Sequence, residues 1–110
     1  MISFSVDPLL QPPDLVGALT APTGTVGGTP TYTWGAVPNA TWYYLWVNDS
    51  TGNKILQWYE ATTAGCGAGT GTCSVTPPTA LAPGAGTWWV QTWSPAGYGP
   101  WSAGMAITVP

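Results

Sequence analysis

The chain has 110 residues, the length of one domain, and only 5% of them are charged. It has a single basic residue, Lys54, and no histidine. Nucleic acid and anionic membrane surfaces are bound through several basic side chains, so we expect neither as a partner. Without histidine, Ser-His-Asp and Cys-His catalysis are excluded, and the commonest metal ligand is missing. We therefore expect neither an enzyme nor a cofactor or metal. No apolar run approaches the roughly 18 residues of a membrane span, which argues against membrane insertion.

Residues 1–17 are predicted to form an extended arm ahead of the domain. Pro8, Pro12 and Pro13 disfavour a central strand there, because proline cannot donate a backbone hydrogen bond to a neighbouring strand. The arm is nevertheless apolar, so we expect it to dock on its own domain or on a neighbour. The side chains assigned to this contact are Ile2, Phe4, Val6, Leu9 and Leu10.

Residues 18–110 are predicted to form one all-β domain. Glycine and proline interrupt every potential helix, and short β-branched and aromatic runs lie between turn signals. In chain order, the predicted strands are 18–21, 31–35, 42–47, 54–61, 73–76, 87–94 and 104–109, with loops or turns at 24–30, 37–40, 48–53, 77–86 and 97–100. Pro22 ends the first strand and places it at a sheet edge. About seven strands in a domain of this size are typical of an immunoglobulin-like β-sandwich.

Several segments carry a resemblance to a known family: Trp34, ATWYYLWV at 40–47, Leu81 with Gly84 and Trp88-Trp89-Val90, and GYGPWS at 97–102. Together they resemble a fibronectin type III domain of bacterial extracellular or surface proteins. That family usually has a tyrosine at the start of its sixth strand, which ties down the preceding corner. Here the position holds Gly86, so the corner is either absent or made by Trp88. The resemblance implies a fold and no activity.

Cys66 and Cys73 lie seven residues apart across a glycine-rich loop. We predict that they form a disulfide, because two exposed thiols in so short a loop would be a liability; two unrelated thiols are the alternative. A disulfide implies an oxidising environment, so we expect an extracellular, cell-surface or virion-surface protein. Two thiols without further ligands do not make a metal site.

Aromatic residues are more numerous than a core of this size requires, with eight tryptophans and five tyrosines. Side chains alternate between the two faces of a strand. The residues predicted to face the core are Tyr43, Leu45 and Val47 on one strand and Trp88, Val90 and Thr92 on another. These two strands are neighbours in this fold, so their outward side chains form one patch, which Trp58 or Tyr59 of the strand at 54–61 widens. The predicted binding face is Trp42, Tyr44, Trp46, Trp58, Trp89, Gln91 and Trp93.

Exposed apolar patches of this kind usually mark a binding surface. Three partners could cover this predicted binding face: other protein copies or domains, a neutral polysaccharide, or the arm of the same chain. We predict a non-catalytic structural and interaction module that contacts protein neighbours through this face and the arm, in a fibre, cell-surface or virion assembly. The alternative is a carbohydrate-binding module that stacks neutral glycans on the same side chains.

Overall fold

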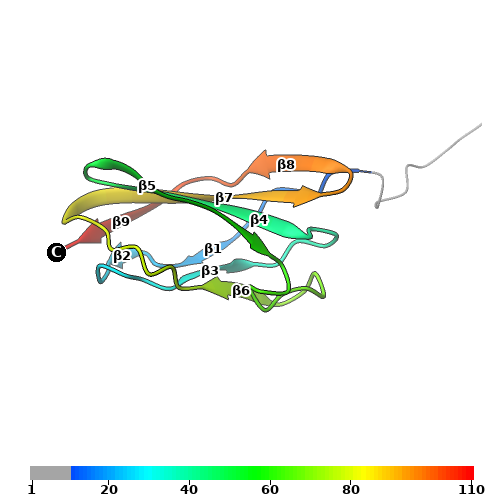
Figure 1. Cartoon of the computed structure of the whole chain (residues 1–110), viewed down its shortest axis with the longest axis horizontal. Coiled ribbons are helices and arrows are strands. Elements are labelled where there is room, and N and C mark those ends of the chain that lie inside the picture. The colour runs from blue at the N-terminus through cyan, green and yellow to red at the C-terminus, as the bar shows by residue number, and fades with distance from the viewer. Residues whose placement is uncertain (1–10) are drawn as a thin grey trace, which may run out of the picture.

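The computed structural model describes residues 11–110, which form a sandwich of two β-sheets (Figure 1). The smaller sheet contains β1 (Leu19–Ala21), β3 (Tyr32–Gly35) and β6 (Thr72–Val75), in the order β1-β3-β6. The larger sheet has the order β2-β9-β7-β4-β5, and β8 pairs with β7. Its strands are β2 (Gly24–Thr25), β4 (Trp42–Asp49), β5 (Gly52–Glu60), β7 (Gly84–Ser94), β8 (Gly97–Trp101) and β9 (Met105–Val109). The all-β sandwich is therefore as predicted.

Two predicted loop segments are strands. Gly24–Thr25, expected within a loop, forms β2 and runs parallel to β9. The segment 97–100, expected as a turn, belongs to β8, and the chain reverses at Pro95 and Ala96 instead. Gly97 has a positive φ of 128°, which lets the chain enter β8 directly after the turn. Strand β7 also begins earlier than predicted, at Gly84.

The core lies between the sheets, and the predicted alternation is correct on both central strands. Six inward side chains have no exposed surface: Tyr43, Leu45 and Val47 of β4, and Trp88, Val90 and Thr92 of β7. Trp34 of β3 is also fully buried and meets Tyr43 with ring centroids 5.5 Å apart. Pro22 ends β1, which lies at the edge of the smaller sheet as expected. Among residues 11–110, no helix is long and apolar enough to cross a membrane.

The corner between β6 and β7 is held by a carboxylate. Asp49 Oδ2 accepts a hydrogen bond from the Ala82 N–H at 2.7 Å, and the Ser50 hydroxyl donates to the Pro83 carbonyl. The Trp88 indole does not tie this corner, because its N–H donates to the Pro22 carbonyl beyond β1, at 3.0 Å. Gly86 leaves no room for the tyrosine: a Cβ there would lie 2.5 Å from the Asn48 carbonyl oxygen.

Cys66 and Cys73 form the predicted disulfide, with Cα atoms 5.0 Å apart. Both are buried, and Cys73 lies in β6 opposite Trp34 of β3. The bridge therefore fastens the chain that crosses from β5 to the smaller sheet. The part of the chain that the structure describes contains no cluster of three or more potential metal-ligating His, Cys, Asp or Glu residues.

The described part of the arm, residues 11–17, packs on its own domain. Val16 is 2% exposed and joins the core. The Thr92 hydroxyl donates to the Asp14 carbonyl at 2.8 Å, and Pro13 is buried beside Gly99 of β8. These contacts lie at the end of the sandwich that carries the β7–β8 hairpin (Figure 1). The predicted arm contacts Ile2, Phe4, Val6, Leu9 and Leu10 lie outside the described residues.

Candidate binding face

The outward side chains of β4 and β7 lie opposite one another in register. Trp42 is paired with Trp93, Tyr44 with Gln91, and Trp46 with Trp89. Opposite residues of an antiparallel pair point to the same face and lie within contact distance. The structure therefore brings these six predicted residues together on the outer face of the larger sheet, where each is partly exposed.

Strand β5 extends this surface through Trp58 and not through Tyr59. Trp58 is paired with Tyr44, and the two rings stack with centroids 4.3 Å apart and an interplanar angle of 11°. Tyr59 is paired with the inward Tyr43 and packs against the core. Burial raises the pKa of Tyr59, consistent with that inward position.

Strand β8 adds two aromatic residues to the surface that the sequence analysis did not assign to it. Tyr98 is 62% exposed, is paired with Trp93, and lies 6.0 Å from Trp58 between ring centroids. Trp101 is 38% exposed and is paired with Gln91. Tyr98 was missed because 97–100 was interpreted as a turn, and Trp101 because no strand was predicted for 101–103. The outer aromatic face is hereafter the predicted set together with these additions: Trp42, Tyr44, Trp46, Trp58, Trp89, Gln91, Trp93, Tyr98 and Trp101.

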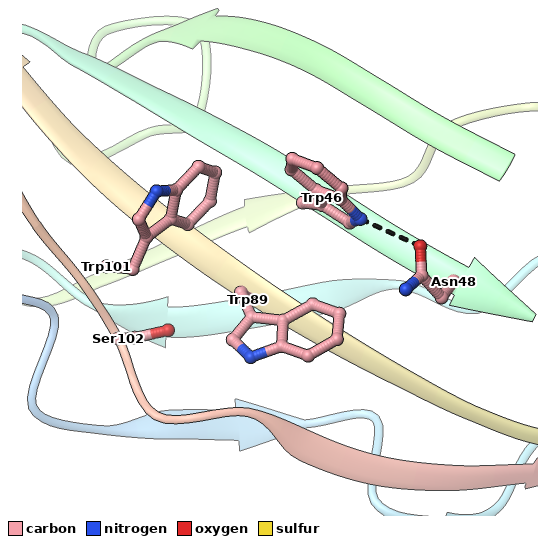
Figure 2. Close-up of a pocket in the computed structure, with 5 residues that line it drawn as sticks. All are labelled: Trp46, Asn48, Trp89, Trp101 and Ser102. Atoms are coloured by element: carbon pink, nitrogen blue, oxygen red, sulfur yellow. Dashed lines mark hydrogen bonds between the residues drawn. The ribbon is translucent and has the colours of Figure 1, made fainter. Parts of the chain in front are cut away.

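Two hollows open on the outer aromatic face. The first has a volume of about 390 Å³ and is lined by Trp42, Trp58, Trp93 and Tyr98. The second has a volume of about 300 Å³ and is lined by Trp46, Asn48, Trp89, Trp101 and Ser102. Figure 2 shows the three indole rings of the second hollow arranged around it, with Asn48 beside Trp46. Every residue lining either hollow is uncharged.

The walls of the second hollow are held by specific contacts. The Trp46 Nε1–H donates to Asn48 Oδ1 at 2.7 Å (Figure 2). The Trp89 indole packs against Gly104, where the absence of a side chain leaves room for it. A Cβ at Gly104 would lie 2.7 Å from Trp89 Nε1. The Ser102 hydroxyl accepts from the Val90 N–H at 3.0 Å and so fixes the chain between β8 and β9 against β7.

No charged residue lines either hollow, although Glu60 of β5 is paired with Trp42 and points to the same face. Asp49, with its side chain fully buried, is 4.0 Å from the partly exposed Lys54 at the turn between β4 and β5. Hydrogen bonds from the Thr51 hydroxyl and the Ala82 N–H lower the pKa of Asp49 to about 2. These groups hold the fold together. The hollows themselves offer flat aromatic surfaces, indole N–H groups, the Tyr98 hydroxyl and the Asn48 amide.

Comparison with solved structures identifies the fold. The FN1–FN3 domains of chicken CNTN1 align with 90% of this chain at 17% identity, with a TM-score of 0.56. The chain spans only 33% of that protein's length. A structure described as FN3tt mut aligns with 91% of this chain at 15% identity, with a TM-score of 0.51, and is covered over 100% of its length. No family model matches the sequence, and no curated protein matches it. At these identities the likeness concerns architecture, and the chain has a fibronectin type III-like fold.

Proposed function

We propose that this domain is a non-catalytic binding module of an extracellular or surface protein, and that its outer aromatic face binds a neutral polysaccharide. The observation that carries the proposal is the pair of hollows, which have aromatic walls and no charged lining residue. A pyranose ring has an apolar C–H face that stacks on an indole, and its hydroxyl groups exchange hydrogen bonds with polar groups beside it. Ligand sites in general combine mostly apolar walls with a few placed polar groups.

An extracellular or surface location is supported by the Cys66–Cys73 disulfide. Disulfides persist in oxidising environments and are rare in the reducing cytosol. A neutral ligand is supported by the composition, because the chain has one basic and four acidic residues. Anionic glycans would find almost no cationic partner on this domain.

Contact with protein neighbours is the second candidate function. It is favoured by the exposed apolar side chains of the same sheet, since Leu56 is 46% exposed and Trp101 38% exposed. A low charge also leaves little electrostatic repulsion between copies. The arm gives this candidate less support than the sequence suggested, because residues 11–17 pack against their own domain through Val16 and the Asp14 carbonyl.

The experiment is electrophoresis of the protein through gels that contain a neutral polysaccharide, using hydroxyethylcellulose, xylan, glucomannan and soluble starch in separate gels. We expect retardation by at least one polymer and loss of retardation in Tyr98→Ala. Leu56→Ala is the matched control, because Leu56 lies opposite Trp46 on the same face and outside both hollows. Migration unaffected by all four polymers would overturn the polysaccharide proposal.

Sedimentation equilibrium separates the second candidate from the first. Assembly through the outer aromatic face predicts dimers or larger species whose fraction rises with protein concentration and falls in Leu56→Ala. A protein that stays monomeric at every concentration would overturn that candidate.

A further inference from the structure

We propose that the two hollows are two subsites for a single glycan chain, so that the ligand is an extended neutral oligosaccharide or polysaccharide and not an isolated sugar. This inference rests on the proposed function and adds the length and the placement of the ligand.

Each hollow is lined by one tryptophan of β4 and the tryptophan of β7 that lies opposite it. Trp42 faces Trp93 in the first hollow, and Trp46 faces Trp89 in the second. The pairs lie four residues apart on both strands, and the antiparallel register relates them by a local two-fold rotation. Four residues of a strand span about 13 Å, at about 3.3 Å each. That separation exceeds the width of one sugar ring and suits a short chain of rings.

An aromatic bridge joins the two hollows. Tyr44 lies between the two tryptophan pairs and stacks on Trp58, which lines the first hollow. Trp101 lines the second hollow and meets Tyr44 with ring centroids 5.8 Å apart. A ligand that leaves one hollow towards the other therefore passes over the Tyr44 ring and beside the uncharged Gln91 amide, and meets no charged group between the two pairs. The outer aromatic face thus offers one continuous path for a neutral chain.

The two subsites differ in polarity. The first hollow is lined by aromatic side chains alone, whereas the second also has Asn48 and Ser102. The Asn48 side-chain oxygen accepts the hydrogen bond from the Trp46 indole N–H. The amide nitrogen of Asn48 therefore points towards the side of the hollow where Trp89 lies (Figure 2). We assign stacking to the first subsite, and stacking together with a hydrogen bond from the Asn48 amide to a sugar hydroxyl to the second.

Isothermal titration with sugars of increasing length tests this arrangement. The probes are glucose, xylose, mannose and N-acetylglucosamine and their β-1,4-linked oligomers of up to six units. Two linked subsites act together once one ligand spans both. For the bound series, we expect the association constant to rise at least about tenfold from the monosaccharide to the length that reaches both hollows, and then to level off.

Variants identify the two subsites separately. Tyr98→Ala in the first hollow and Trp101→Ala in the second should each abolish the gain with length, leaving a weak association constant that hardly depends on the number of units. Leu56→Ala should retain the gain. Tyr98 and Trp101 are 62% and 38% exposed, so both variants are expected to fold, and their thermal unfolding checks this.

The possible failures are distinguishable. If a monosaccharide binds as tightly as its hexasaccharide, or if either hollow variant keeps the gain with length, the two-subsite arrangement is overturned and polysaccharide binding stands. If no sugar of any length binds, and no gel retards the protein, both proposals are overturned.

Discussion

The indole of Trp101 meets that of Trp46 edge to face, with ring centroids 5.7 Å apart, although β7 lies between their two strands. Trp101 is paired on β7 with Gln91, whose side chain is smaller than those of Trp89 and Trp93, the outward residues before and after it. Its amide donates to the Gly99 carbonyl at 3.1 Å, along β8. Trp101 therefore reaches across β7, and the aromatic residues of β4, β5, β7 and β8 form one surface.

The hydrogen bond from Trp88 to Pro22 should contribute measurably to stability. Trp88→Phe removes part of a fully buried ring and leaves the Pro22 carbonyl without its partner. Trp34→Phe is the matched control: it removes the same atoms from an equally buried ring whose N–H has no hydrogen-bond partner among the described residues. An unpaired buried polar group costs about 1–3 kcal/mol. Urea unfolding followed by far-ultraviolet circular dichroism should show Trp88→Phe to be the less stable variant by that amount. Equal losses would mean that the bond contributes nothing.

Asp49 should make the stability depend on pH at the acidic end. Its pKa falls from an ordinary 3.8 to about 2 in the folded protein. Between these values the unfolded chain binds a proton that the folded chain does not, so the free energy of unfolding decreases as the pH falls from about 4 to 2. Urea midpoints measured across this range should fall in the wild type and much less in Asp49→Asn. A parallel slope in Asp49→Asn would contradict this assignment.

The disulfide should stabilise the domain by limiting the freedom of the unfolded chain. For a loop closed by residues seven apart in sequence, loop entropy predicts a contribution of about 2–3 kcal/mol. The double variant Cys66→Ser/Cys73→Ser should lose about that much free energy of unfolding in urea. The wild type with reductant should approach the value of the variant, and reductant should not change the variant itself. Equal free energies of unfolding for the oxidised and the reduced wild type would contradict this prediction.

Gly104 should control the position of Trp89. Gly104→Ala places a Cβ against the indole, which must then shift and reshape the second hollow. The indole N–H signal of Trp89 in a proton–nitrogen NMR spectrum should move in this variant without any ligand. Gly27→Ala is the control, because a Cβ there has no atom within 4 Å. An unmoved Trp89 signal in Gly104→Ala would contradict the close packing.

The sequence predicted the architecture and the central strands because their signals are local. The alternation of β4 and β7 assigned Tyr43 and Trp88 to the core and placed Trp42 and Trp93 on the outer face before any pairing was known. The disulfide was predictable because Cys66 and Cys73 lie close in sequence, and two exposed thiols in so short a loop would be a liability.

The remaining features depend on tertiary contacts that no local pattern carries. Strand β2 has two residues, Gly24–Thr25, and exists because the edge of β9 is available to pair with it. Strand β8 contains glycine and proline, so its composition resembles a turn, and Trp101 joins the face only because Gln91 leaves room beside Tyr44. The corner hydrogen bond from the Ala82 N–H to the Asp49 carboxylate links residues 33 positions apart, and only the folded structure shows it.

The indole N–H signals of the protein test the central claim most directly. The chain has eight tryptophans, of which Trp34 and Trp88 are fully buried in the core and the other six belong to the outer aromatic face. On addition of the hexasaccharide of the polymer that retards the protein most, we predict shifts of the signals from both tryptophan pairs and from Trp101, with Trp34 and Trp88 unchanged. If a bound sugar shifts none of the outer indoles, the outer aromatic face is not the binding surface.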